Sequence, residues 1–219
     1  YKLAIIASGT AYADALQFEE TEAASTYNLL EDGSFEKTLA MTATTDDTYW
    51  DIAPGSWYRL NAATVTTSSD TYYGSDVLSI TADTNRHHVM QKIDMTCPAG
   101  STFLVSAWAK STANPDSVLE KGPATDPFFG IFVRLCYADG TKEVQFFAFE
   151  AYYPDWQYRQ GIVAPKEANA GKEIREIIVA LGYDNNYNTA LFDNVSFRIE
   201  PAQTYYYDDD GNLKSAAQS

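Results

Sequence analysis

Apolar and polar residues alternate over long stretches of this chain. In residues 103–110, the two alternating sets are Phe103, Val105, Ala107 and Ala109, and Leu104, Ser106, Trp108 and Lys110. The stretch 129–137 repeats this pattern with Phe129, Ile131, Val133, Leu135 and Tyr137 on one side. Successive side chains of a strand point to opposite faces of a sheet, so a period of two residues predicts β-strands.

Further strands are expected at short intervals along the chain. The expected ranges are 57–66, 76–82, 88–95, 141–151, 155–163, 174–181 and 190–199. The turn Ala138-Asp139-Gly140 joins two of the strands as a hairpin, because its glycine can adopt a positive φ. Many closely spaced strands without an amphipathic helix between them indicate a sandwich or a barrel.

The charge of the chain excludes some partners. Its 219 residues carry a formal net charge of −15, whereas nucleic acids and anionic membranes are bound through basic patches. No stretch has the length of a transmembrane helix, so membrane insertion is not expected. The acidic balance fits an extracellular protein, and it fits equally well a surface whose carboxylates serve only solvation.

The two cysteines leave two alternatives open. Cys97 and Cys136 form neither a C-x-x-C pair nor a zinc-binding pattern. Cys97 precedes a proline at an expected strand end, and Cys136 lies within an apolar strand. They are either two buried thiols or a disulfide.

An internal repeat links the two ends of the chain. When Asp14 is aligned with Asp193, Ala11 falls on Ala190 and Phe18 on Phe197. The first copy has no opening half in front of it. Residues 1–26 are therefore interpreted as the closing strands of a preceding sister module, followed by a linker, and we expect this orphaned segment to add to a sheet edge.

Between residues 27 and 200, six motifs follow one another in a fixed order. They are the opening Asn28–Glu36, then Trp50, Ser79-Ile80 with Met90–Ile93, Thr102–Lys110, Asp155–Gln157 and the closing Phe192–Val195. This order resembles the carbohydrate-binding-module-like jelly rolls of the galactose-binding-like superfold, although Asp32 stands where the family's opening motif has Asn. The resemblance implies an all-β fold, a jelly-roll β-sandwich of two antiparallel sheets.

The tail carries a second resemblance. Residues 205–213, Tyr-Tyr-Tyr-Asp-Asp-Asp-Gly-Asn-Leu, look like the Y-x-Y-D-x-x-G-N-L signature of YD (RHS) repeats. Such repeats build β-rich shells in bacterial wall-associated proteins and toxins. Residues 201–219 are thus expected to begin a YD-repeat region, and the protein is expected to be extracellular or attached to a bacterial cell wall.

Glycan binding is the first functional hypothesis. Sugars stack on aromatic rings while planar polar side chains bind their hydroxyl groups. Trp108 and Arg134 each point away from the expected core set of their own strand, so they are proposed as a platform. The platform is rimmed by Trp57, Tyr72 and Tyr73. Phe132 opposes the core set of its strand in the same way as Arg134. In the alternative interpretation Trp108 and Phe132 are core of the second sheet face, and Trp57 and Tyr72 only decorate loops.

The resemblance also implies a structural calcium ion where the first strand meets the last. Calcium prefers carboxylate and carbonyl oxygens. Glu36 matches the glutamate of the opening motif and Asp193 the aspartate of the closing motif. Alternatively, Asp193 binds a loop backbone without a metal. Trp50 and Trp156 are assigned to core packing, since their counterparts in the family start strands.

No catalytic motif stands out in the sequence. A nucleophile elbow, a zinc-protease helix, a phosphate loop and a dinucleotide fingerprint are all missing. We therefore expect a non-catalytic module that binds glycan and contacts neighbouring modules of the same polypeptide. The alternative is a structural spacer or stalk without a ligand.

Overall fold

The computed structural model describes ten segments of the chain. They are residues 27–37, 41–44, 50–61, 63–81, 85–111, 127–150, 153–186, 188–200, 203–207 and 213–218. They belong to two units, one within residues 26–200 and one that includes the C-terminal residues 201–219, and each unit is described by itself. The expected segment 1–26 and its repeat lie outside the described residues. The expected domain boundaries stay predictions.

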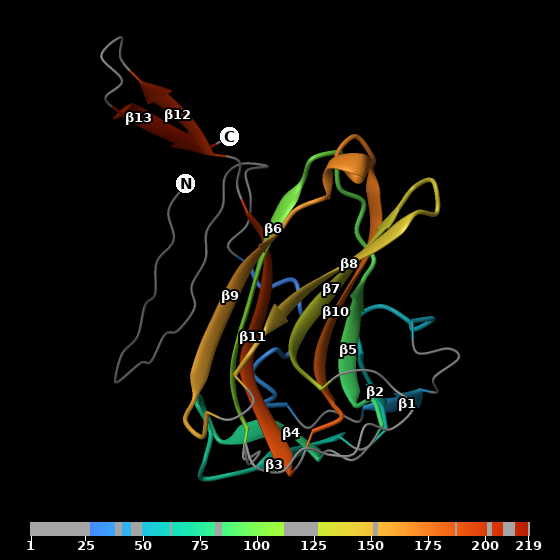
Figure 1. Cartoon of the computed structure of the whole chain (residues 1–219), viewed down its shortest axis with the longest axis vertical. Coiled ribbons are helices and arrows are strands. Elements are labelled where there is room, and N and C mark those ends of the chain that lie inside the picture. The colour runs from blue at the N-terminus through green and yellow to red at the C-terminus, as the bar shows by residue number, and fades with distance from the viewer. Residues whose placement is uncertain are drawn as a thin grey trace, which may run out of the picture. The chain divides into compact units, whose positions relative to one another are not determined.

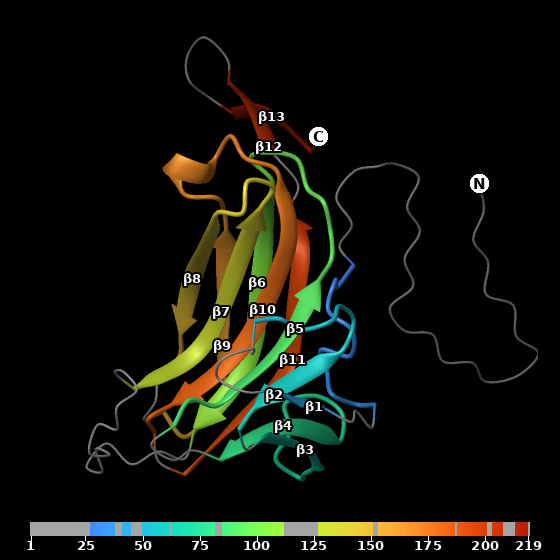
Figure 2. The ribbon, with the colours of Figure 1, turned by 90° about the vertical axis from the view of Figure 1, so that its right-hand side faces the viewer.

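A six-stranded sheet forms one layer of the first unit. Its strands, in spatial order, are β1 (Thr42–Thr44), β2 (Trp57–Leu60), β5 (His88–Ile93), β10 (Ile174–Asp184), β7 (Phe128–Tyr137) and β8 (Lys142–Ala148). Neighbouring strands are antiparallel except β1 and β2, which run parallel. This sheet faces the viewer in Figure 2.

A five-stranded sheet forms the other layer (Figure 1). Its strands, in spatial order, are β3 (Ala63–Thr67), β4 (Asp76–Thr81), β11 (Thr189–Glu200), β6 (Thr102–Ser111) and β9 (Gln157–Val163). All its pairings are antiparallel. The only helix in the described segments is the 3-10 turn η1 (Glu167–Asn169), so the all-β expectation is confirmed. None of the described residues form a helix that could cross a membrane.

One expected strand is in fact two. The range 57–66 divides into β2 and β3, which belong to different sheets. The break falls at Asn61, whose φ is 63° and whose side chain donates a hydrogen bond to the carbonyl oxygen of Arg86 at 2.6 Å. Asparagine tolerates this left-handed conformation better than most residues, so the chain can cross between the layers here.

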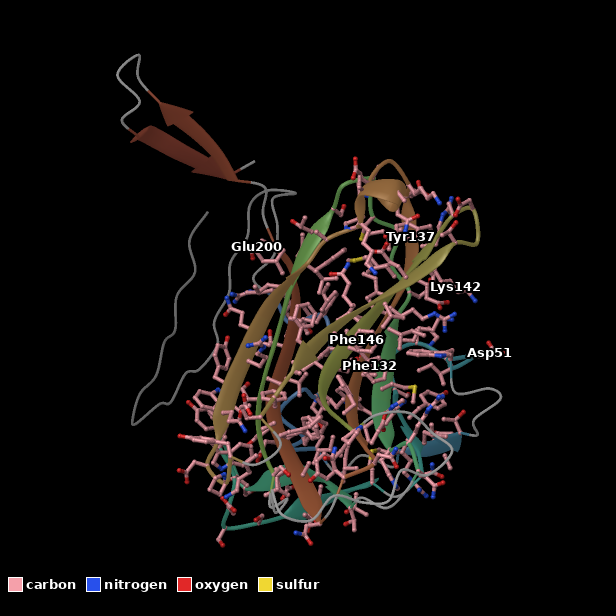
Figure 3. All side chains as sticks on the ribbon, in the orientation of Figure 1. Asp51, Phe132, Tyr137, Lys142, Phe146 and Glu200 are labelled. Atoms are coloured by element: carbon pink, nitrogen blue, oxygen red, sulfur yellow. The ribbon has the colours of Figure 1, made fainter. Side chains whose placement is uncertain are left out.

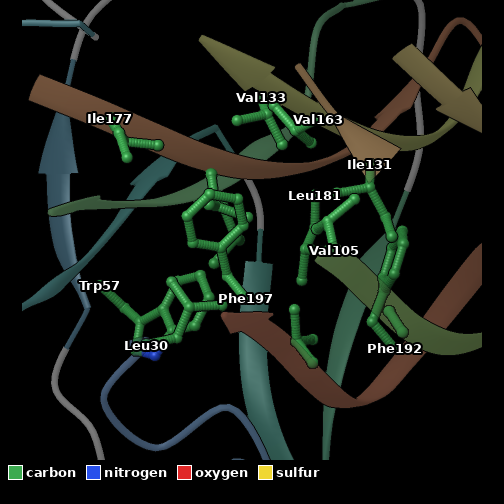
Figure 4. Close-up of a cluster of buried hydrophobic side chains, with 14 of the residues drawn as sticks. Leu30, Trp57, Val105, Ile131, Val133, Val163, Ile177, Leu181, Phe192 and Phe197 are labelled. Carbon is green, nitrogen blue, oxygen red and sulfur yellow. The ribbon is translucent and has the colours of Figure 1, made fainter. Parts of the chain in front are cut away.

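The alternation read from the sequence decides which side chains fill the space between the sheets. Phe103, Val105, Ala107 and Ala109 are completely buried, and Ile131, Val133 and Leu135 of β7 meet them from the other sheet. Figure 4 shows several of these side chains converging from both layers. The opposite set, which includes Trp108 and Arg134, points to the two outer faces.

The start of the sandwich is fastened to its last strand. The amide of Leu29 donates to the carbonyl of Phe197 and the amide of Val195 donates to the carbonyl of Gly33, both at 2.7 Å. A Cβ atom at Gly33 would overlap the carbonyl oxygen of Val195, so only glycine allows this close approach. Asn194 has a φ of 49° within the β-bulge of β11, which presents Val195 to this contact.

Both cysteines are buried free thiols. The backbone of Cys97 forms an isolated antiparallel β-bridge with that of Ile174. The Cys136 thiol contacts a carboxylate oxygen of Glu176 at 3.5 Å. Burial raises the pKa of each thiol, which keeps both of them protonated and unreactive at neutral pH. The thiol alternative is therefore the one observed.

The second described unit is a β-hairpin. Strand β12 (Gln203–Tyr207) pairs antiparallel with β13 (Leu213–Gln218). The first three tyrosines of the YD-like motif lie in β12, and its Leu213 begins β13. Residues 208–212, which contain the rest of the motif, lie outside the described residues.

Candidate functional site

The expected glycan platform is divided between two sides of the sandwich. Trp108 lies in β6 of the five-stranded sheet, and Arg134 lies in β7 of the six-stranded sheet. Both point outward, as the alternation predicts, but the outer faces of two stacked sheets face opposite directions. The expectation that these residues form one platform is therefore wrong, because the sequence pattern does not tell which sheet a strand joins.

Trp57 also has a different role from the one expected. Its side chain is only 2% exposed and lies in the core between the sheets (Figure 4). Its ring centre is 5.4 Å from that of Phe35, and its Nε1 donates a hydrogen bond to the carbonyl of Glu31 at 2.8 Å. Placing Trp57 on the rim of a ligand platform was wrong, because β2 turns this side chain inward.

Two of the expected residues, Tyr72 and Trp108, do meet, on the outer face of the five-stranded sheet. The Tyr72 ring stacks on Trp108 with centroids 3.6 Å apart, and Tyr73 is exposed beside it in the chain. Trp108 also lies 5.2 Å from the ring of Tyr158, and Tyr72 lies 6.1 Å from Trp156. We call Tyr72, Trp108, Trp156 and Tyr158 the Tyr72 surface.

Trp156 was expected in the core and instead belongs to this surface. Its Nε1 is 3.3 Å from a carboxylate oxygen of Asp70, and the ammonium group of Lys110 lies 5.9 Å from its ring centre. Lys110 also pairs with Asp70 at 2.6 Å. The polar groups around Trp156 are thus already paired with one another.

The two expected metal ligands hold the loop that carries Tyr72. The Oδ2 atom of Asp193 accepts the amides of Tyr72 and Tyr73 at 3.0 and 2.8 Å, and its Oδ1 accepts the amide of Asn194 at 2.6 Å. Glu36 accepts the amides of Ser75 and Asp76, each at 3.0 Å. Both carboxylates therefore act on one loop.

The electrostatics of the two carboxylates differ. Burial raises the pKa of Asp193 by more than its three backbone hydrogen bonds lower it, and the nearby charge of Glu36 adds to the increase. For Glu36, the hydrogen bond from the Asp76 amide is the largest influence, and the pKa falls below its usual value. A buried carboxylate with raised pKa is costly to keep ionised, so it needs its backbone donors.

The carboxylate oxygens of Glu36 and Asp193 do not fit a calcium site in this arrangement. Backbone N–H groups occupy the carboxylate oxygens that a cation would use, and their partial positive charge opposes a cation. No group of three or more acidic, histidine or cysteine side chains among the described residues could hold a metal ion. The hydrogen bonds match the alternative interpretation of Asp193, while calcium stays a prediction.

Thermal unfolding distinguishes these two interpretations. If backbone hydrogen bonds alone hold the loop, the melting temperature will be the same in excess EDTA and in millimolar calcium chloride. A bound structural ion would instead raise the melting temperature with calcium concentration, because a ligand of the folded state stabilises it by mass action. Magnesium chloride at equal ionic strength is the control for a general salt effect.

A second aromatic group lies on the outer face of the six-stranded sheet. Phe132 and Phe146, from neighbouring strands β7 and β8, have ring centres 6.1 Å apart and lie side by side in Figure 3. The Trp50 ring meets Phe132 edge-on at 5.6 Å, and the Arg134 guanidinium carbon lies 4.7 Å from the centre of the Trp50 ring. We call Trp50, Phe132, Arg134 and Phe146 the Arg134 face.

This face is built on a second apolar layer. The residues buried there are Ile52, Leu60, Met90, Phe132, Ile178 and Ala180. Trp50, Tyr58, Phe128 and Val144 pack against them. Phe146, by contrast, stays 64% exposed although it contacts Phe132. Trp50 and Phe132 are thus packed on this layer, while the Phe146 ring stays exposed.

Some of the charged groups near the aromatic rings are paired with one another. Lys92 bonds Glu176 at 2.5 Å, and His88 Nε2 lies 2.9 Å from a carboxylate oxygen of Asp184. Arg134 is 8% exposed, and its Nη1 is shielded from solvent without a hydrogen-bond partner in the described segments. A buried N–H group without a partner costs about 1–3 kcal/mol, so this atom calls for an explanation.

Only part of this face could be found from the sequence. The alternation of residues in β7 placed Phe132 and Arg134 on the side opposite the core set, and Arg134 was predicted to bind ligand. Trp50 was assigned to the core, which is wrong: it is partly exposed and packs on the outer face. Phe146 was missed because the pairing of Phe132 with Phe146 depends on the register of the hairpin.

Solved structures with the same fold include a carbohydrate-binding module. The xylan-binding CBM22-1 domain of Xyn10C from Paenibacillus barcinonensis is similar over 82% of this chain and 97% of that domain, with a TM-score of 0.51 and 14% identity. No protein-family model matches the sequence, and no curated protein matches it. At this identity the likeness establishes the fold only. The jelly-roll β-sandwich expected from the motifs is confirmed.

The same fold occurs in a phage enzyme. The enzymatically active domain of tailspike protein 4 from bacteriophage CBA120 is similar over 79% of this chain, with a TM-score of 0.50 and 14% identity. The match covers 21% of the tailspike chain, about a fifth of its length. The fold by itself therefore does not separate binding modules from parts of enzymes.

Proposed function

We propose that this sandwich is a non-catalytic module that binds glycan through the Arg134 face. The observation that carries the proposal is an exposed aromatic ring, Phe146, which contacts Phe132 of the buried apolar layer. It lies on the same face as Arg134, whose buried Nη1 has no hydrogen-bond partner among the described residues. Sugar rings bind by stacking an apolar face on an aromatic ring and by hydrogen bonds to planar polar groups. Phe146 and Arg134 offer one group of each kind.

The shared fold adds support of a weaker kind. A neighbour with this architecture is named for xylan binding, although its sequence is only 14% identical. Which polysaccharide this chain binds therefore does not follow from that neighbour. Among the described residues no catalytic motif is recognisable, and a non-catalytic role remains part of the proposal.

A glycan array tests the proposal with a matched pair of variants. Phe146→Ala should weaken binding about tenfold or more, since losing a stacked ring costs on the order of 1.4 kcal/mol. Tyr158→Ala, which removes an aromatic ring that is 49% exposed on the opposite sheet, should leave binding unchanged. Absence of binding by the wild-type protein to any glycan would instead favour the alternative, a structural spacer.

We further propose that the chain belongs to a bacterial cell-surface or secreted YD-repeat protein. The YD-like motif supports this proposal, because its Tyr205–Tyr207 lie in β12, which pairs with β13, the strand that begins at the motif's Leu213. The negative charge is compatible with an extracellular location. In such a protein, the sandwich would connect neighbouring modules while presenting the Arg134 face.

A further inference from the structure

The Nη1 atom of Arg134, buried without a hydrogen-bond partner among the described residues, indicates which glycans the module would prefer. We propose that the Arg134 face recognises saccharides that carry a carboxylate, such as uronic acids; this inference rests on the proposed glycan-binding function. Arg134 lies in the centre of a sheet rather than on a loop, with Ile178 of β10 and Val144 of β8 as its direct neighbours. Its position is therefore fixed by two strand pairings.

The charge balance of this face points to an anion. Lys92 has the Glu176 carboxylate within 3 Å, and a ring nitrogen of His88 lies within 3 Å of an Asp184 carboxylate oxygen. Arg134 makes no ion pair with the described residues, and its Nη1 is both buried and unpartnered. A buried positive charge without a partner is costly, and a ligand carboxylate would remove that cost.

The geometry of the groups favours a carboxylate over a hydroxyl group. A guanidinium presents its N–H donors in a planar fork that binds the two oxygens of a carboxylate together. Phe146 is next to Phe132 and exposed, so it can carry the sugar ring whose carboxylate reaches Arg134. An acidic sugar would thus use both of the unoccupied groups of the face at once.

Trp50 lies against the group that carries this donor. Its ring centre is 4.7 Å from the guanidinium carbon of Arg134, and the Nη1 atom is not reached by solvent. A carboxylate that bonds Nη1 would change the surroundings of this ring, so binding should change the fluorescence of Trp50. The change should disappear in Trp50→Phe, which leaves the other three tryptophans in place.

The net charge of the protein determines how the affinity for an acidic saccharide should depend on salt concentration. A net charge of −15 repels an acidic saccharide at long range, and added salt screens this repulsion. The contact with a shielded guanidinium is screened much less. Affinity for an acidic saccharide should therefore hold or rise with ionic strength, whereas non-specific binding of a polyanion to a basic surface weakens steeply.

Calorimetric titration of the full chain tests the inference with three ligands of equal length. They are an oligogalacturonate, its methyl ester and a neutral galacto-oligosaccharide. The acid should bind about 10- to 100-fold more tightly than the ester, which is the size of a charge-assisted hydrogen bond. Arg134→Gln should lose this preference and bind the acid and the ester equally. The loss of affinity caused by the substitution and the loss caused by esterifying the ligand should therefore not add.

Two further variants serve as controls for charge and for position. Arg134→Lys keeps the charge but not the fork, and it should recover only part of the preference for the acid. Lys110→Gln removes a cation of the Tyr72 surface and should leave the preference unchanged. A circular-dichroism melt of each variant verifies that it is folded before titration.

The outcomes separate the inference from the proposed function. Equal affinity of the wild-type protein for the acid, the ester and the neutral sugar would overturn the inference and leave glycan binding intact. Loss of preference in Lys110→Gln but not in Arg134→Gln would also overturn it. Binding to none of the three ligands, together with an empty glycan array, would reject the proposed function itself.

Discussion

Trp57→Ala is expected to lower the free energy of unfolding by about 3–5 kcal/mol, the cost of removing a large side chain from a packed core. Trp57 is among the largest fully buried side chains of the sandwich and packs against Phe35, which belongs to the opening segment. The substitution also removes one of the two side-chain hydrogen bonds to the carbonyl of Glu31, and only the bond from Gln91 remains.

Chemical denaturation followed by circular dichroism measures this effect. Trp156→Ala is the matched control, because it removes the same side chain from the partly exposed Tyr72 surface and should cost about 1 kcal/mol or less. Trp57→Phe covers the case in which the alanine variant does not fold, with a smaller loss in the same direction. Equal losses for Trp57→Ala and Trp156→Ala would contradict the placement of Trp57 in the core.

Asp193→Ala is expected to cost about 3 kcal/mol, since it leaves three part-buried backbone N–H groups without their acceptor at once. Asp193 is 0% exposed, and its two oxygens accept the amides of Tyr72, Tyr73 and Asn194. Without these bonds the loop loses its attachment to β11, and Tyr72 should leave its stack on Trp108. Tryptophan fluorescence should report that release.

The control for Asp193 comes from the same loop. Asp70→Ala breaks an exposed pair with Lys110, and such pairs contribute about 0–1 kcal/mol. Asp193→Asn retains one acceptor oxygen and should fall between the two alanine variants in the same denaturation assay. A loss for Asp193→Ala no larger than that for Asp70→Ala would show that the loop does not depend on this carboxylate.

The sequence predicted the strands well because alternation is a local property. The parity of β6 and β7 identified the side chains of both strands that lie between the sheets. The hydrogen bonds of Asp193 match the interpretation in which it binds a loop backbone. What the sequence could not supply was the assignment of strands to sheets. Trp108 and Arg134 have the same outward parity, yet they lie on opposite sides of the molecule because β6 and β7 belong to different layers.

The candidate site was harder to predict for the same reason. Phe146 and Phe132 are neighbours only through the register of β7 with β8, and Trp50 reaches Arg134 from a segment far away in the sequence. Trp57 and Trp156 exchanged their expected roles because a tryptophan near a strand start can turn to either face. Tertiary pairing, rather than residue type, decided each of these placements.

We propose that glycan binds on the outer face of the six-stranded sheet. Amide chemical shifts in NMR spectra of the isotope-labelled protein, recorded while a saccharide that it binds is added, locate the binding face. We expect the largest shifts at Arg134 and Phe146 and in the neighbouring strand β10. Shifts confined to residues 70–73 and to β9, the region of the Tyr72 surface, would contradict it.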